Sequence, residues 1–286
     1  MFEILRLRAR LGSPAIAKLL KARPPRGYVG LPALAGGRCA ACTAASAAGG
    51  AASEGRLAAC AAACPTGAIA PGEPRVDLGR CTFCGDCARA CVAACKTGGD
   101  GAIRFTGFHR LAATSREALV VGPGAEEDYE ERAIAARRDL RSLLGRSLKL
   151  RQVSAGGCNA CEMELNAASN VNFDMGRLGI EWVASPRHAD GLVLTGPLSA
   201  NMADALQDAW DAMPEPKILI LAGACAISGG VFASSPSLDR GFLDRVRPDL
   251  YVPGCPPHPL TFIHGILSLL GKGERRRGGR DQAGAR

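Results

Sequence analysis

Four cysteines in the first half of the chain have a spacing that is typical of iron-sulfur chemistry. Cys81, Cys84, Cys87 and Cys91 follow the pattern C-x2-C-x2-C-x3-C. Three closely spaced thiolates on one loop can hold three corners of a cubane 4Fe-4S cluster, and the fourth cysteine of such a run usually ligates a second cluster. The run therefore predicts a partner motif elsewhere in the chain and a role in electron transfer.

The partner motif lies upstream, where Cys39-x2-Cys42 is followed by Cys60-x3-Cys64-Pro65. The segment between them, residues 43–59, is rich in Ala, Gly and Ser. Because closure entropy rises only slowly with loop length, such an insertion still allows the cysteines on either side to converge. Together the two cysteine groups resemble a bacterial two-cluster ferredoxin.

The ferredoxin resemblance implies a crossed pairing of the eight cysteines. One cluster takes Cys81, Cys84, Cys87 and Cys64, and the other takes Cys39, Cys42, Cys60 and Cys91. The sequence departs from the family where Val92 replaces the proline expected after Cys91, and Cys95 is an alternative ligand to Cys91. The spacing favours Cys91.

Zinc is the structural alternative to iron-sulfur clusters, because paired C-x2-C units also form tetrahedral zinc sites. A zinc site does not need the run of four cysteines, whereas a cubane does. We do not expect disulfides, because the sequence shows no secretory signal and cytosolic thiols stay reduced.

From Leu148 onward, short β-rich runs alternate with helical stretches, a pattern that predicts an α/β domain. We expect strands at 148–153, 180–184, 191–195, 217–221 and 250–252, and helices at 161–168, 202–213 and 259–270. The helix at 202–213 would be capped by Ser199 or Asn201. The predicted fold is a flavodoxin-like parallel sheet domain, preceded by a small α+β ferredoxin-like domain.

Four further cysteines follow the ends of three predicted strands: Cys158, Cys161, Cys225 and Cys255. Loops at the carboxyl ends of parallel strands meet at one edge of the sheet, so these thiolates can close a third 4Fe-4S site. Cys158, Cys225 and Cys255 lie among Gly or Pro residues, and glycine allows close backbone approach to a cluster.

Several motifs around these cysteines resemble the small subunit of nickel-iron hydrogenases, over roughly residues 148–271. They are the runs 157–164, 184–190, 195–197, 223–225 and 252–257. The resemblance is strongest to the group 4, energy-converting branch, which is related to the 20 kDa subunit of respiratory complex I. The Cys158-x2-Cys161 spacing is of the hydrogenase type, because the complex I subunit has two adjacent cysteines at this place.

This resemblance implies an electron-transfer subunit in which three 4Fe-4S clusters connect to the active site of a hydrogenase large subunit. The ferredoxin-like part resembles a separate electron-entry subunit of such complexes, as in formate hydrogenlyase, fused here to the small subunit. Nickel would belong to the partner, because this chain lacks the paired C-x2-C motifs of a large subunit. The family's carboxylate falls on Glu164, a possible proton relay, with Glu162 as a competitor.

Three other functions remain open. The chain could serve a complex I-like quinone-reducing complex or a hydrogenase-related complex without nickel. It could also be a freestanding ferredoxin or a zinc-stabilised scaffold.

The charge distribution indicates where the chain acts. Of the net charge of +8, residues 1–26 contribute +6 and residues 272–286 contribute +4, so the remainder sums to −2. Basic ends on a near-neutral body predict contact with a membrane surface or with other subunits of a membrane-bound complex. Nucleic-acid binding is disfavoured, because only 5% of residues are aromatic and no binding motif accompanies the charge.

No apolar run reaches the length of a membrane span, so we expect a cytoplasmic protein, peripheral at the inner face of the cell membrane. We divide the chain into a basic segment (1–30), a ferredoxin-like domain (31–108), a connector (109–147), the α/β domain (148–271) and a basic tail (272–286).

Overall fold

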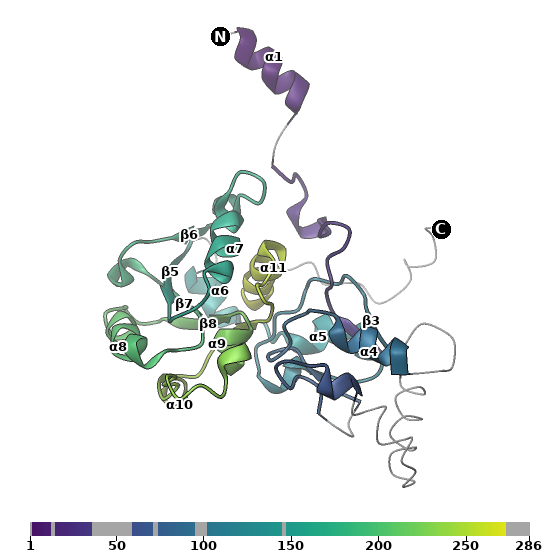
Figure 1. Cartoon of the computed structure of the whole chain (residues 1–286). Helices are drawn as coiled ribbons and strands as arrows, with labels where there is room; N and C mark the ends of the chain where they lie inside the picture. The colour runs from purple at the N-terminus through teal and green to yellow at the C-terminus, as the bar shows by residue number, and fades with distance from the viewer. Residues whose placement is uncertain are drawn as a thin grey trace.

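A computed structural model describes residues 2–12, 15–35, 59–70, 74–94, 102–144 and 147–272. The predictions for Cys39, Cys42, Cys95, most of the insertion at 43–59 and nearly all of the basic tail lie outside these residues. A larger α/β part and a smaller cysteine-bearing part lie side by side (Figure 1).

A five-stranded parallel sheet forms the centre of the α/β part. Its strands are β5 (Leu148–Ser154), β6 (Ile180–Trp182), β7 (Gly191–Thr195), β8 (Ile218–Ala222) and β9 (Leu250–Val252). The order across the sheet is β6-β5-β7-β8-β9. Counted along the chain this is 2-1-3-4-5, the order of flavodoxin-type doubly wound sheets. The predicted parallel α/β sheet is confirmed.

Burial explains why these short runs form strands. Every residue of β7 and β8 is buried, as expected for central strands of a parallel sheet with both faces covered. A side chain at Gly191 would lie 2.7 Å from Cγ1 of Ile218 and 2.9 Å from Cδ2 of Leu150. Glycine at the start of β7 therefore leaves room for the side chains of Leu150 in β5 and Ile218 in β8. The three central strands can pack closely for this reason.

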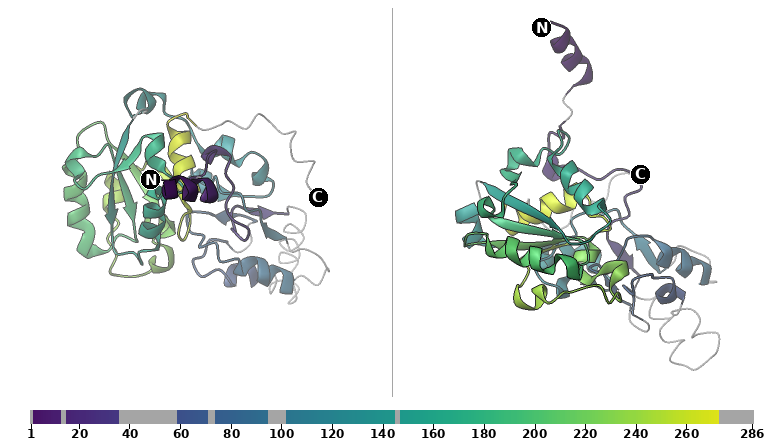
Figure 2. Two further views of the ribbon diagram at one scale, coloured as in Figure 1. Left: turned by 90° about the horizontal axis from the view of Figure 1, so that it is seen from above. Right: turned by 60° about the vertical axis from the view of Figure 1, so that its left-hand side comes forward.

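Helices cover both faces of this sheet (Figures 1 and 2). One face packs against α7 (Ala160–Ser169) and α11 (Pro259–Leu269), through a core that includes Leu150, Leu165 and Phe262. The other face packs against α8 (Ala203–Asp211), α9 (Ala224–Ser228) and α10 (Phe242–Arg245).

The predicted caps of the 202–213 helix are wrong. A 3-10 turn at Ala200–Met202 precedes α8, and no side chain caps either element. The Ser199 amide instead donates to the Ala155 carbonyl (3.1 Å). Ser199 is therefore used to join two loops at the sheet edge. By contrast, α11 has a side-chain cap, because Nδ1 of His258 accepts from the Leu260 amide (3.1 Å).

The smaller part is built from short antiparallel pairs. β1 (Pro32–Leu34) pairs with β3 (Ile103–Phe105), and β2 (Val76–Asp77) pairs with β4 (Val120–Val121). The helix α4 (Asp86–Ala94) carries Cys87 and Cys91, and the loop before it carries Cys81 and Cys84. Two- and three-residue strands provide little regular structure, so this part depends on packing against its surroundings.

The segment expected to be a connector joins both parts. Beyond β4 it contains α5 (Tyr129–Ala133) and α6 (Arg138–Leu144). Ala113 pairs with Tyr251 of β9 through two backbone hydrogen bonds of 2.9 and 2.8 Å. This bridge adds residue 113 to the open edge of β9, which protects that edge from pairing with other chains.

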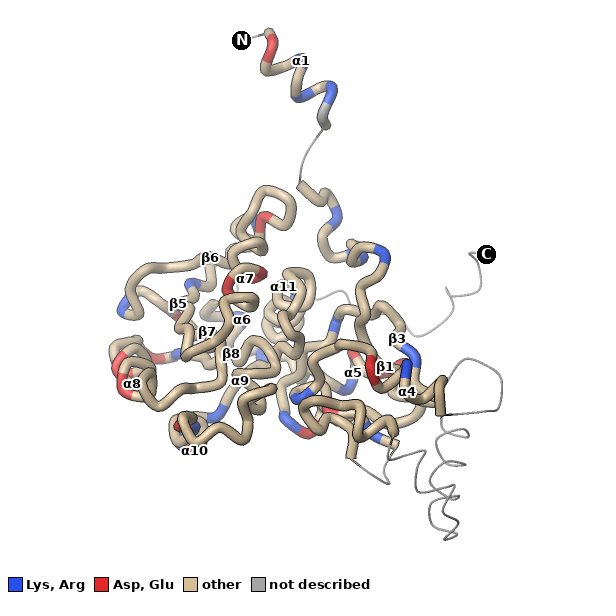
Figure 3. Tube along the Cα trace, viewed as in Figure 1, with Lys and Arg blue, Asp and Glu red and all other residues tan. Residues whose placement is uncertain are grey.

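The N-terminal helix α1 (Phe2–Leu11) projects away from the rest of the molecule (Figures 1 and 2). The helix ends at Leu11, and the helical element within residues 15–23 is a 3-10 turn (Leu19–Lys21). Basic side chains recur along this stretch (Figure 3). Among the described helices, none is long and apolar enough to cross a bilayer.

Candidate metal centre

The structure brings all four C-terminal cysteines together beyond the carboxyl ends of the strands. Cys158 and Cys161 follow β5 at the start of α7, Cys225 lies in α9 after β8, and Cys255 follows β9. Burial raises the pKa of the Cys161 thiol to about 12, with further increases from Glu162 and from the other three cysteines. Burial also raises the pKa of Cys225 to about 11, again with increases from Cys255 and Cys158. Four interacting thiols therefore share one site.

The site lies at the protein surface. Cys158 and Cys255 are exposed, whereas Cys161 and Cys225 are half-buried. In the described part of the chain, no three His, Cys, Asp or Glu side chains are placed to hold a single metal ion. A 4Fe-4S cluster is held by four thiolates, which is the donor set found here.

Glycines make room around the sulfur atoms. A side chain at Gly223 would lie 2.6 Å from Sγ of Cys161, and one at Gly230 would lie 2.8 Å from Sγ of Cys225. Both have positive φ angles, +96° and +55°, which favour glycine. The loops after β8 and β9 are tied by hydrogen bonds from the Gly223 amide to Val252 (2.9 Å) and from the Ala224 amide to Gly254 (2.8 Å). This glycine-lined cradle fits an iron-sulfur cluster.

The two candidate carboxylates after Cys161 have different surroundings. Glu162 is buried, with 8% of its surface exposed, and accepts a hydrogen bond from the Thr195 hydroxyl (2.6 Å). Glu164 is half-buried, and burial raises the pKa of its carboxyl above the usual range. It also interacts electrostatically with Tyr28, whose pKa is raised mainly by burial. The sequence contains no signal that would connect Tyr28 to this site.

Four cysteines of the smaller part also come together. Burial raises the pKa of Cys81 to about 12, with increases from Cys87, Cys64 and Cys84. Burial likewise raises the pKa of Cys87 to about 11, with increases from Cys64 and Cys84. These four residues are one of the two sets that the ferredoxin resemblance implies.

Backbone amides donate to several of these sulfurs. The Phe83 amide donates to Cys81 (3.3 Å) and the Ala68 amide donates to Cys64 (3.2 Å). Amide donors of this kind tune the potential of an iron-sulfur site. The buried Cys91 accepts from the Ala102 amide (3.2 Å), and Cys60 is half-buried. The second set stays a prediction, as does the choice between Cys91 and Cys95.

The two described sulfur groups are neighbours. Cys84, which is exposed, interacts electrostatically with the exposed Cys255 and raises its pKa, although burial is the larger cause. The loop before Cys81 packs closely on α9, because a side chain at Gly79 would lie 2.7 Å from Cγ2 of Ile227. Cys255 and Cys84 therefore mark the place where the two parts of the molecule approach each other.

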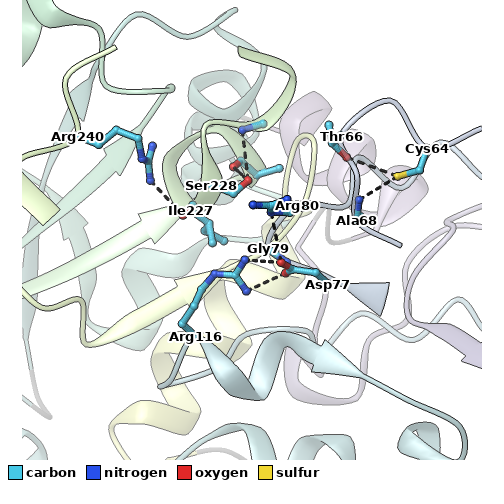
Figure 4. Close-up of polar contacts among 12 residues, drawn as sticks. Cys64, Thr66, Ala68, Asp77, Gly79, Arg80, Arg116, Ile227, Ser228 and Arg240 are labelled. Carbon is cyan, nitrogen blue, oxygen red and sulfur yellow. Dashed lines mark hydrogen bonds and ion pairs between the residues drawn. The ribbon is translucent and has the colours of Figure 1, made fainter. Parts of the chain in front are cut away.

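An ion pair anchors the loop before Cys81. Arg116 donates two hydrogen bonds to the Asp77 carboxylate, of 2.8 and 2.5 Å (Figure 4). The Gly79 amide donates to the same carboxylate (2.9 Å). Because a bidentate guanidinium pair fixes orientation as well as distance, this contact helps to hold the cysteine loop against the α/β part.

A parallel α/β sheet with four cysteines at its carboxyl edge defines a class of iron-sulfur oxidoreductase subunit. Residues 158–269 match the family of the 20 kDa subunit of NADH-ubiquinone oxidoreductase. A probable membrane-bound hydrogenase subunit, mbhJ, of Pyrococcus furiosus is 41% identical over 134 residues, which are 46% of this chain and 80% of that protein. Formate hydrogenlyase subunit 7 of Escherichia coli is 39% identical over 148 residues, which are 51% of this chain and 58% of that protein.

The chain belongs to this family of complex I 20 kDa subunits and hydrogenase small subunits, through its C-terminal half. The family binds a 4Fe-4S cluster and transfers electrons in oxidoreductase complexes. A solved membrane-bound sulfane sulfur reductase contains a chain that is 23% identical, with a TM-score of 0.41, over 49% of this chain and 78% of that one. The family match begins at residue 158, so the ferredoxin-like interpretation of the first half stays a prediction.

Proposed function

We propose that this chain is the electron-transfer subunit of a membrane-associated nickel-iron hydrogenase complex. It would carry electrons through three 4Fe-4S clusters to or from the active site of a large subunit. The observation that carries this proposal is the meeting of Cys158, Cys161, Cys225 and Cys255 at one exposed sheet edge, next to Cys84 of the smaller part.

The residues of this chain would act as ligands and spacers. The four C-terminal cysteines would hold the cluster nearest the large subunit, and Cys64, Cys81, Cys84 and Cys87 would hold the next one. Cys39, Cys42, Cys60 and Cys91 would hold the third. Each bound cluster supplies one-electron redox chemistry. The exposure of Cys158 and Cys255 supports docking of a partner at the first site. The electrostatic interaction of Cys84 with Cys255 supports transfer between the two groups.

The spacing of Cys158 and Cys161 supports a hydrogenase rather than a quinone-reducing complex. The alternative has support of its own, because one of the NADH-quinone oxidoreductase subunits of Clostridium beijerinckii is 41% identical over 117 residues. The two proposals differ in the partner. A large subunit that co-purifies with nickel supports the hydrogenase, and one without nickel supports the alternative.

Glu164 would relay protons at the docking surface. Its half-buried position and raised pKa support this role, since a proton relay works best when its pKa is near the working pH. Turnover of a complex with Glu164→Gln tests it, and unchanged turnover would remove the relay. Glu162 is less suited, because its carboxylate is engaged with the Thr195 hydroxyl.

The basic ends would attach the complex to its site of action. The partners proposed are the hydrogenase large subunit and further subunits of a membrane-bound complex at the inner face of the cell membrane. The projecting α1 carries Arg6, Arg8 and Arg10 beside exposed Phe2 and Ile4, a composition that suits contact with anionic lipid or with another subunit.

Metal analysis of the full chain tests the proposal. Protein purified without oxygen should contain about twelve irons and about twelve sulfides per chain, as three cubanes require. EPR of the reduced protein should show signals of 4Fe-4S clusters. Zinc without sulfide would establish the scaffold instead, and a stable lone monomer that binds no large subunit would establish a freestanding ferredoxin.

A further inference from the structure

Arg240 lies beside the C-terminal cysteine site without being a ligand. Its guanidinium donates to four carbonyl oxygens: Pro197 (3.2 Å), Cys225 (3.2 Å), Ala226 (2.8 Å) and Ile227 (3.1 Å). Figure 4 shows the side chain reaching the carbonyl of Ile227. One side chain thus ties the loop after β7 to α9, the helix that carries Cys225.

The positive charge of Arg240 has no carboxylate in direct contact. Within the described ranges every ion pair closer than 4.0 Å involves other residues. Arg116, by comparison, is paired with Asp77 at 2.5 Å. A guanidinium stays protonated in proteins, and carbonyl oxygens orient it without neutralising it. Arg240 therefore keeps its positive charge, which Asp244 attracts from beyond ion-pair distance.

The charge acts on the cysteine site more than on solvent. Arg240 is only partly exposed, and burial lowers its pKa while attraction to Cys225 raises it. A half-buried charge is screened by salt and water less than an exposed one. The electrostatic effect of Arg240 on groups around Cys225 is accordingly stronger than that of a surface arginine.

We propose that Arg240 is a positioning residue that raises the reduction potential of the cluster held by Cys158, Cys161, Cys225 and Cys255. The inference depends on the cluster assigned to this site under the proposed function. Reduction adds one electron and no proton to a site that four thiolates already make negative, so a fixed positive charge nearby favours the reduced form.

A redox titration of the full chain, reduced stepwise with dithionite and monitored by EPR, tests this proposal. Arg240→Gln removes the charge, and Arg240→Lys keeps the charge but loses the four-carbonyl fork. The control is Arg245→Gln, which removes the same charge from an exposed arginine that donates to Gln207 (2.9 Å). Iron and sulfide are measured in each variant.

If the charge of Arg240 sets the potential, the variants should differ in the reduction potential of the C-terminal cluster in a defined order. Arg240→Gln should make the cluster at least about tenfold harder to reduce, which is a fall of about 59 mV for a one-electron couple. Arg240→Lys and Arg245→Gln should each change the equilibrium by less than about threefold, which is under half that shift.

Two results would overturn the inference and leave the proposed function standing. One is a Gln variant with full iron and the wild-type potential. The other is a Lys variant that shifts the potential, or loses the cluster, to the same extent as the Gln variant. Charge would then have no effect, and Arg240 would only hold the two loops together. A wild-type chain without iron at this site would instead remove the proposed function.

Discussion

The two described cysteine groups present the same donor atoms but reach their positions in opposite ways. Cys81, Cys84 and Cys87 are close in sequence, and one loop together with the first turn of α4 brings them together. Cys158, Cys225 and Cys255 are far apart in sequence, and only the parallel sheet brings their loops to one edge. The first group depends on local spacing, and the second depends on a complete fold.

The surrounding structure differs in the same way. Around the C-terminal group, β7 and β8 are wholly buried and the helices α7 and α11 pack on them. Around the N-terminal group the strands β1 to β4 have only two or three residues each. We therefore expect the C-terminal site to form before metal binds, whereas the N-terminal site should need its metal to hold its shape.

Removing one ligand from each group gives the largest effect. Cys161→Ser should remove about four irons per chain and lower turnover of the complex by roughly 100-fold or more, since even the partners behind metal ligands are worth 10–100-fold. Cys81→Ser should remove about as much iron but leave the C-terminal cluster in place, with an EPR signal that has lost the coupling to its neighbour. Iron analysis and EPR check both. Unchanged iron in either variant would contradict the assignment of that group.

Removal of the metal should destabilise the smaller part more than the α/β part. When iron is chelated from the reduced protein, amides of β7 and β8 should keep their protection from hydrogen exchange. Amides of residues 76–94 should lose protection by roughly tenfold or more, because their order depends on bound metal. Mass spectrometry of exchanged peptides measures this. Equal losses of amide protection in both parts would contradict the expected difference between the two sites.

Core truncation should show the same difference with a smaller effect. Leu192→Ala, in the middle of the sheet, should cost about 4 kcal/mol of unfolding free energy, near the upper part of the 2–5 kcal/mol range for such changes. Leu34→Ala in β1 should cost about 2 kcal/mol, because a short two-stranded pair can collapse around the cavity. Both residues are buried, at 0% and 4% exposure. Urea unfolding followed by circular dichroism gives the two values, and a larger cost for Leu34→Ala would be contrary to this account.

The smallest effect concerns Glu164, which faces Tyr28 of the N-terminal segment. Burial raises the pKa of Glu164 from its usual value of 4.5. A raised carboxyl pKa stabilises the fold below the unfolded pKa, and this stability is lost as pH rises through the folded pKa. Relative to Glu164→Gln, the wild-type Tm should therefore fall between about pH 4 and pH 7.

The neighbouring Asn166→Ala, at an exposed position, is the control for this pH series. Its Tm difference from wild type should not follow that trend, because the change involves no titrating group. A wild-type Tm that rises relative to Glu164→Gln over the same range would show that the carboxyl pKa is lowered.

Much of the α/β part could be predicted from local patterns. The strands at 191–195 and 250–252 have the bounds expected from their apolar runs, because a buried parallel strand is a continuous apolar segment between turn residues. The cap of α8 could not be predicted, since the 3-10 turn at Ala200–Met202 separates Ser199 from the start of the helix. The pairing of β2 with β4 was also missed, because a two-residue strand has no periodicity to recognise.

The candidate site shows the same limit. The C-terminal cysteines could be grouped from sequence, because each follows a strand of one sheet. The involvement of Tyr28 and Arg240 could not be predicted, since they interact with Glu164 and with the Cys225 carbonyl through tertiary structure that follows no spacing rule. Position in space, rather than residue type, gives these side chains their roles.

The central claim is that the two sulfur groups hold adjacent clusters that exchange electrons. EPR of the fully reduced, anaerobically purified chain tests it most directly, in wild type and in Cys161→Ser. Because Cys84 interacts electrostatically with Cys255, the wild-type spectrum should be split or broadened by spin coupling between the C-terminal cluster and its neighbour. Cys161→Ser should abolish that coupling. A wild-type spectrum that is the plain sum of uncoupled clusters, unchanged by Cys161→Ser, would contradict the account.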